Sequence, residues 1–167
     1  MATIEPRKNL PRLIQAFLNF QKNTKTDIYL VLVGRENKKI FQKEKINLKD
    51  KRIVLIERVI SVREKKWLYQ KALGFIYVSL LEGFGLPLVE AMSQGCPLIY
   101  SNTSSLQEIG QGVGMAVNPT SITEIEAAMS LLSKDLSLRK KLSKKGLQKA
   151  SFFSWDQAGK EVCGLII

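Results

Sequence analysis

Short apolar runs alternate with stretches of helical periodicity along this chain, and that alternation constrains its fold more than any other feature. The run Ile28 to Val33 is uniformly apolar and rich in β-branched residues, which is typical of a parallel-sheet strand covered on both faces. From about Asn9 to Asn23, large apolar residues recur three and four positions apart, as in an amphipathic helix. Such alternation favours a sheet wound by right-handed crossovers. We therefore predict an α/β fold, a Rossmann-like parallel sheet with helices on both faces.

The same alternation continues to the end of the chain. Further strands are predicted at Arg52 to Ile56, Gly74 to Ser79, Pro97 to Tyr100 and Met115 to Val117. Further helices are predicted at Glu36 to Lys45, Ser61 to Lys71 and Leu86 to Gln94, then from Ser105, from Ser121, through the lysine-rich segment around Leu142, and from Ser154.

Several of these helices have recognisable start signals. Asn9 suits an N-cap and Pro11 a first helical turn. Ser105 with Glu108, and Ser121 with Glu124, have the spacing of capping boxes.

Ligands of parallel sheets bind beyond the carboxyl ends of the strands. The loops at Gly34-Arg35, Ile56 to Val59, Leu80 to Gly85 and Ser101 to Ser104 all follow predicted strands, so we expect them to share one rim.

The length of the chain and its lack of histidine exclude several classes of protein function. The 167 residues have room for a single domain, 1–167, and its apolar runs are far shorter than the roughly 20 residues that span a bilayer. Without a signal pattern, this predicts a cytoplasmic protein. The chain has no histidine and two distant cysteines, Cys96 and Cys163, so the usual zinc ligands and nucleophile–histidine pairs are missing. Any chemistry must use carboxylates or an outside group.

The formal net charge of +11 would attract nucleic acid, anionic lipid or a phosphorylated small molecule, and charge alone does not choose between them. Much of the excess follows helical spacing near the C-terminus, where a solvated helix face is the simpler interpretation. These residues are Lys134, Arg139, Lys140, Lys141, Lys144, Lys145 and Lys149.

The most informative segment runs from Glu82 to Glu90, where an apolar strand gives way to a glycine-punctuated turn and then a helix. Pro87 suits the first turn of that helix, which leaves the amides of Phe84, Gly85 and Leu86 free at a helix N-terminus. Free amides and the helix dipole together make an anion site. Both glutamates can border that pocket and accept hydrogen bonds from sugar hydroxyls. Alternatively, Glu82 is a loop charge and Glu90 complements the helix dipole.

A second candidate lies in Glu5 to Asn9, where Arg7 and Lys8 directly precede a helix start. Arginine binds phosphate oxygens as a fork and lysine as a point charge, so the two could hold a diphosphate. Taken alone, two basic residues near a terminus are usually solvated. Their expected place on the same rim as Glu82 favours the phosphate interpretation.

These residues resemble the group 1 sugar transferases, glycosyltransferase family 4, whose members have two Rossmann-like domains in the GT-B arrangement. The resemblance covers nearly the whole chain. Residues Thr3 to Leu10 are similar to the family's donor-phosphate loop, and Glu82 to Glu90 to its E-x7-E signature. Ser101 to Glu108 and Phe153 to Trp155 resemble later landmarks in the same order. The chain would then be the C-terminal, donor-binding half of such an enzyme.

The resemblance implies a role for each motif residue. Lys8 would hold the diphosphate, assisted by Arg7 and by Arg35. Glu82 would take part in catalysis with Lys8, and Gly83 and the amides of Phe84, Gly85 and Leu86 would meet the donor sugar and its phosphate. Glu90 would accept from the ribose hydroxyls, and Val59 would flank the base. Such enzymes retain the anomeric configuration and generally need no bound metal, so no cofactor is expected.

Two departures from the family pattern bear on activity. Thr3 stands where many members carry a second diphosphate cation. Family members also enter the phosphate loop from a central strand that follows an acceptor-binding domain, whereas this sequence begins at Met1. We therefore expect a fragment without the N-terminal acceptor domain, with most of that strand missing and apolar edges exposed, and inactive alone.

The donor would be a nucleoside diphosphate sugar, with GDP-mannose suggested by a likeness to bacterial surface-polysaccharide transferases. The acceptor would be a glycan or a lipid-linked molecule, which places the full enzyme at the inner membrane face. Two alternatives stay open. One is a basic nucleic-acid-binding module, against which no aromatic platform or nucleic-acid motif is found. The other is a glycoside hydrolase that uses Glu82 and Glu90 as its carboxylate pair.

Overall fold

Parallel strands in two ladders form the centre of the molecule, and the computed structural model describes residues 5–24, 27–34, 42–43, 48–57 and 61–164. In the first ladder, β1 (Leu30–Val33) pairs with β2 (Ile53–Ile56). In the second, β4 (Leu98–Ser101) lies between β3 (Phe75–Tyr77) and β5 (Gly114–Val117). Every pairing is parallel, so the predicted α/β class is confirmed.

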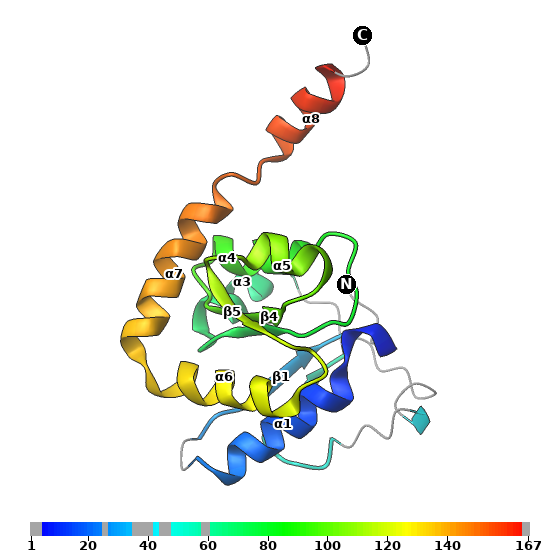
Figure 1. The fold of residues 1–167 in the computed structure, drawn as a ribbon, viewed down its shortest axis with the longest axis vertical. Helices are drawn as coiled ribbons and strands as arrows, with labels where there is room; N and C mark the ends of the chain where they lie inside the picture. Colours follow the sequence, from blue (N-terminus) through cyan, green and yellow to red (C-terminus); the bar gives the residue numbers. More distant parts are fainter. Residues whose placement is uncertain (1–4, 25–26, 35–41, 44–47, 58–60, 165–167) are drawn as a thin grey trace.

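Helices cover both faces of these strands (Figure 1). On one face α1 (Leu10–Lys22) packs along α6 (Ile122–Lys134), and on the other lie α4 (Leu86–Ser93) and α5 (Ser104–Gly110). The long α7 (Leu136–Ala150) packs against α4, and α8 (Trp155–Gly164) extends away from the sheets. A single 3₁₀ turn, η1 (Pro6–Lys8), precedes α1, and α3 (Val62–Lys71) precedes β3. Helices on both faces were predicted, and this is confirmed.

The strand β4 explains why the core has two parts. All four of its residues are buried, and its three apolar side chains alternate between two apolar clusters. Leu98 and Tyr100 pack with α4 and α5, whereas Ile99 packs with α1 and α6. Successive side chains of a strand point to opposite faces, so a strand between two helical layers must be apolar throughout.

The strand β1 departs from the prediction that both of its faces are covered. Leu30 and Leu32 are buried against the α1 side, but Val31 and Val33 are 43% and 39% exposed. No ladder joins β1 to β3 within the described ranges, and a cavity of about 1070 Å³ lies between them, lined by apolar residues of both. The continuous apolar run was therefore correct evidence for a strand and wrong evidence for burial of both faces.

The helix start signals were partly correct. Pro11 lies in the first turn of α1 as predicted. The Ser121 hydroxyl accepts from the Glu124 amide, but the Glu124 carboxylate accepts from the amide of Asn118, so the capping box is incomplete. The prediction of a box from Ser105 to Glu108 is wrong, because α5 begins at Ser104. Of the predicted helix at Glu36 to Lys45, only residues 42–43 are described and are helical.

Membrane insertion finds no support in the described part of the chain, since none of its helices combines the length and the apolar character that a bilayer crossing demands.

Candidate functional site

The carboxylate of Glu82 is the centre of a network that joins two distant segments. Its Oε1 accepts hydrogen bonds from Lys8 Nζ at 2.6 Å and from the Tyr77 hydroxyl at 2.8 Å. Its Oε2 accepts from the Arg7 guanidinium at 2.5 Å. The Glu82 side chain is only 8% exposed. The predicted meeting of the Arg7-Lys8 loop with the Glu82 turn is therefore present.

Main-chain and side-chain contacts hold these two segments together. The Leu80 amide, just after β3, donates to the Arg7 carbonyl at 2.8 Å. The buried Asn9 side chain donates to the carbonyls of Val78 and Pro119, at 3.0 and 2.7 Å. Asn9 was predicted to cap α1, but its side chain makes no cap bond and its backbone is left-handed, with φ of 59°. While Nδ2 donates to these two carbonyls, Oδ1 accepts from the Arg12 guanidinium at 3.0 Å instead of from an amide of the first turn.

The turn into α4 exposes the helix N-terminus as predicted. Gly85 is the N-cap, with φ of 104°, a conformation that favours glycine. Pro87 lies in the first turn, so the amides of Phe84, Gly85 and Leu86 precede the first intrahelical acceptors. Phe84 and Leu86 are each 48% exposed, and a Cβ on Gly83 would meet nothing within 4 Å. An anion could therefore approach these amides.

Ser105, which was predicted to cap a helix, instead contacts the Glu82 turn. Its hydroxyl donates to the Glu82 main-chain carbonyl at 3.0 Å, so α5 anchors the turn instead of capping itself.

The second carboxylate, Glu90, lies one helical turn further into α4 and is 41% exposed. Its Oε1 lies 2.6 Å from Lys65 Nζ, and its Oε2 accepts from the Tyr69 hydroxyl at 3.3 Å. Glu82 and Glu90 both line the same cavity, together with Lys8 and the turn from Phe84 to Pro87. The prediction that the two glutamates border one pocket is thus confirmed.

The electrostatics of the network keep Glu82 ionised. Burial raises the pKa of Glu82, but the hydrogen bonds it accepts, led by that from Lys8, outweigh burial and hold this pKa below its ordinary value. Burial and the adjacent Glu82 carboxylate raise the pKa of Tyr77, so the phenol stays a hydrogen-bond donor. At neutral pH Glu82 is therefore a pure acceptor.

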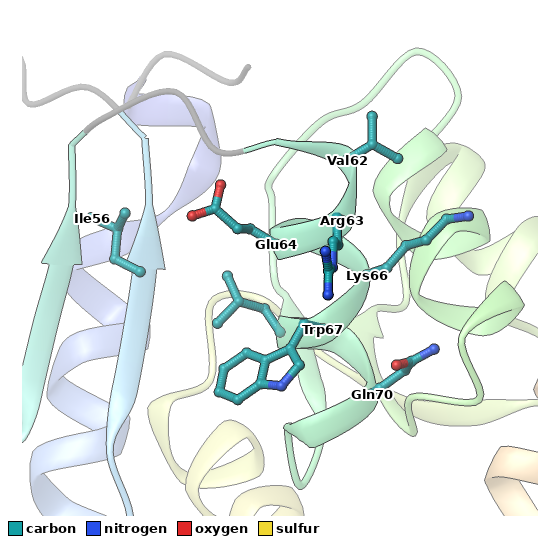
Figure 2. Close-up of a pocket in the computed structure, with 8 residues that line it drawn as sticks. Ile56, Val62, Arg63, Glu64, Lys66, Trp67 and Gln70 are labelled. Carbon is teal, nitrogen blue, oxygen red and sulfur yellow. The ribbon is translucent and has the colours of Figure 1, made fainter.

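A separate hollow of about 910 Å³ lies between β2 and α3. Figure 2 shows Ile56 facing Glu64 and Trp67 across it, while Lys66 points to the other side of the helix. None of the predicted site residues among those described lines this hollow.

Two predicted site residues, Arg35 and Val59, lie outside the described residues. Three others that line or join the cavity were not predicted: Tyr77, Lys65 and Tyr69. Tyr77 ends a strand at the expected rim, and that position could have indicated it. Lys65 and Tyr69 could not be found in this way, because the sequence does not say which face of α3 meets Glu90.

Sequence comparisons with known proteins identify the family of this chain. The model of "Glycosyl transferases group 1" matches residues 1–149. The chain is 33% identical over 159 residues to the O-antigen chain mannosyltransferase B of Escherichia coli, covering 93% of this chain and 42% of that protein. It is 33% identical over 119 residues to the O-antigen chain mannosyltransferase RfbU of Salmonella typhimurium, covering 68% of this chain and 32% of that protein. The chain thus spans less than half the length of these relatives.

Solved structures agree in fold. Anabaena Alr3699/HepE, in complex with UDP-glucose, matches 99% of this chain and 47% of its own, with a TM-score of 0.84 at 18% identity. The sucrose-phosphate synthase of Thermosynechococcus elongatus matches 96% of this chain and 43% of its own, with a TM-score of 0.78 at 23% identity. Since the family model covers most of the sequence, the chain belongs to the group 1 glycosyl transferases.

Proposed function

We propose that this chain is the donor-binding part of a retaining glycosyltransferase, which moves a sugar from a nucleoside diphosphate sugar to a glycan or lipid-linked acceptor. The observation that carries the proposal is the junction of Arg7, Lys8 and Glu82 beside the free N-terminus of α4. Lys8 and the residues that carry the main-chain donors line one cavity there, and Arg7 bonds to Glu82 at its border. Such a cluster suits a diphosphate, and the ionised carboxylates suit the hydroxyls attached to it.

The cations have donors to spare for a diphosphate. Lys8 carries three N–H donors, of which Glu82 and Tyr77 take two, and Arg7 carries five. Arg7 is 43% exposed, so its remaining donors are accessible to a ligand. As the bond to the sugar breaks, negative charge grows on the departing diphosphate. Lys8, Arg7 and the α4 amides would stabilise that charge, and this is the main catalytic contribution we assign to them.

Glu82 would accept hydrogen bonds from the donor sugar and fix its orientation. The same property argues against a glycoside hydrolase in which Glu82 is the general acid. A hydrolase needs one carboxyl group protonated to act as general acid, and burial or a like charge normally raises the pKa of that group. The pKa of Glu82 is lowered instead, because Lys8 and its neighbours stabilise the carboxylate.

The nucleic-acid alternative rests on the basic face of α7. Two of its cations have structural partners. Arg139 donates to the carbonyls of Leu132 and Ser133 at the end of α6, and Lys149 to those of Glu108 and Gln111 near the end of α5. Cations at the C-termini of helices are stabilising, so part of this charge is accounted for by the fold.

The donor we propose is GDP-mannose. Its sugar is suggested by the names of the O-antigen mannosyltransferase relatives, and we take the guanine base as part of the proposal.

Calorimetric titration of the chain tests this function, with GDP-mannose, GDP, UDP-glucose and UDP as ligands. We expect GDP-mannose to bind, and Lys8→Met to weaken it at least about tenfold because a charged phosphate contact is lost. Lys141→Met, which removes an equal charge from an exposed position on α7, is the matched control. Unaltered binding in Lys8→Met, or an equal loss of binding in Lys8→Met and Lys141→Met, would refute the site.

A further inference from the structure

The Glu90 carboxylate has two partners on one face of α3. Lys65 and Tyr69 are four residues apart in that helix, so their side chains project in the same direction. Lys65 Nζ lies 2.6 Å from Oε1 of Glu90, and the Tyr69 hydroxyl lies 3.3 Å from Oε2. Each oxygen of the Glu90 carboxylate therefore has its own donor. Both donors are on α3, so α3 orients the carboxylate of a residue on α4.

The N-terminus of α3, the helix that supplies these donors, is capped. Ser61 and Glu64 form a complete capping box at the beginning of α3: the Ser61 hydroxyl accepts from the Glu64 amide, and the Glu64 carboxylate accepts from the Ser61 amide. A capped first turn holds the next turn, which carries Lys65, in helical register.

Glu90 and Glu82 share two kinds of partner. Glu82 has a lysine, Lys8, and a tyrosine, Tyr77, just as Glu90 has Lys65 and Tyr69. Phe75 joins the two sets, because its ring packs edge-on to Tyr69 at 5.2 Å and stacks on Tyr77 at 5.6 Å. Aromatic pairs at these separations are favourable and restrict ring motion. The two tyrosines that donate to these carboxylates are therefore joined through one aromatic row.

We propose that Lys65 and Tyr69 are positioning residues that orient the Glu90 carboxylate for the two ribose hydroxyls of the donor nucleotide. This inference rests on the proposed function, in which Glu90 accepts from the ribose. Each carboxylate oxygen can accept two hydrogen bonds, so a partner on α3 leaves one position free on each oxygen. Two free positions on adjacent oxygens match a vicinal diol. The 41% exposure of Glu90 leaves them open to the cavity.

Tyr69 donates to Glu90 in this arrangement. Burial, and then the Glu90 carboxylate, raise the pKa of Tyr69, so its hydroxyl keeps its proton at any physiological pH. A neutral phenol oxygen is a weaker acceptor for the ribose hydroxyls than the Glu90 carboxylate. Lys65, which has no acceptor atom, cannot accept from the ribose at all.

The test compares ribose and dideoxyribose nucleotides in calorimetric titrations. The ligands are GDP and 2′,3′-dideoxy-GDP, with UDP and its dideoxy analogue in parallel. For Lys65→Met we expect about a tenfold loss of affinity for the ribonucleotide and less than about a twofold change for the dideoxy form. Tyr69→Phe should give a smaller loss of about threefold. Lys65→Arg should recover most of the affinity, since it restores a cationic donor.

Lys66→Met is the matched control, because Lys66 is the neighbouring lysine on α3 and, unlike Lys65, does not line the cavity that Glu90 lines. If Lys65→Met weakens both nucleotide forms equally, Lys65 supports the fold alone and the inference is wrong. Tighter binding of the ribonucleotide would also overturn it, because Lys65 would then compete with the ribose for Glu90.

Glu90→Gln separates this inference from the proposed function. If that variant loses ribose discrimination and Lys65→Met does not, only the role of Lys65 fails. If the unaltered chain binds both forms equally, the ribose role of Glu90 fails as well. Circular dichroism of every variant checks that α3 and α4 are intact.

Discussion

The ammonium of Lys8 and the carboxylate of Glu82 lie 2.6 Å apart although 74 residues separate them. Their side chains are only 13% and 8% exposed, so water replaces neither partner easily. Removal of one member of such a pair leaves a poorly solvated charge. The contact therefore contributes to the joining of η1 to the turn before α4, and it can be measured as stability without any ligand.

A change of Glu82 to glutamine should lower the free energy of unfolding by about 1–3 kcal/mol, because Lys8 and Arg7 lose their anionic acceptor. Urea titration measures this loss. A double-mutant cycle with Lys8→Met isolates the pair, and we expect a coupling energy of about 1–2 kcal/mol. Additive effects of the two substitutions would show that the contact is energetically neutral.

The same carboxylate predicts a pH dependence. Burial raises the pKa of Glu82, but hydrogen bonds led by that from Lys8 bring it below its ordinary value of 4.5. A lowered pKa in the folded state means that this stabilisation is complete above the unfolded value and is lost as pH falls through the folded value. The urea midpoint of the unaltered chain should therefore fall more steeply below about pH 4.5 than that of Glu82→Gln. Equal slopes would contradict the assignment.

The two glycines of the turn should differ sharply in tolerance. At Gly85 an added Cβ would lie 2.6 Å from Cδ2 of the buried Leu106, and φ is 104°. Gly85→Ala should therefore cost about 2–4 kcal/mol from strain and overpacking. Gly83→Ala, where a Cβ meets nothing within 4 Å, is the matched control and should cost less than about 1 kcal/mol. Thermal unfolding of both variants tests this, and equal losses would mean that the turn conformation is different.

Asn9 should be the most sensitive polar residue near the site. It is 1% exposed and satisfies the carbonyls of Val78 and Pro119. Asn9→Ala should cost about 2–4 kcal/mol, because two buried carbonyls lose their donor and alanine tolerates φ of 59° poorly. Asn9→Gly removes the strain but not the lost hydrogen bonds, so it should recover only part of the loss. Full recovery by glycine would assign the whole effect to the backbone.

Several of these features explain what the sequence could and could not predict. The helices and strands were predictable because their apolar spacing is local, as in α1 and β4. The side-chain partners of Asn9 and Ser105 were not, because each residue fits a local capping pattern and yet bonds a distant carbonyl. A capping pattern shows which local hydrogen bond a side chain can make. It does not show which carbonyls the fold brings near that side chain, and in this structure Asn9 and Ser105 donate to such carbonyls.

The candidate site likewise contains residues that the sequence could predict and residues that it could not. Glu82, Gly85 and Pro87 lie in one turn, so their chemistry could be predicted from order along the chain. Lys65 and Tyr69 contact Glu90 across 25 and 21 residues, and only the packing of α3 beside α4 selects them among the polar residues of that helix.

The last prediction concerns metal dependence. In the proposed function, the charge of the diphosphate is balanced by Lys8, Arg7 and the α4 N-terminus, so a divalent cation is not required to bridge it. We expect the affinity for GDP-mannose to be unchanged, within about twofold, when EDTA replaces added Mg²⁺ or Mn²⁺. Affinity should fall as salt is raised, because the contacts are largely between charges. Lys8→Met should weaken that salt dependence, while Lys141→Met should leave the slope close to that of the unaltered chain. Loss of binding in EDTA, with recovery on addition of Mg²⁺, would show that the side-chain cations do not suffice and would overturn this part of the proposal.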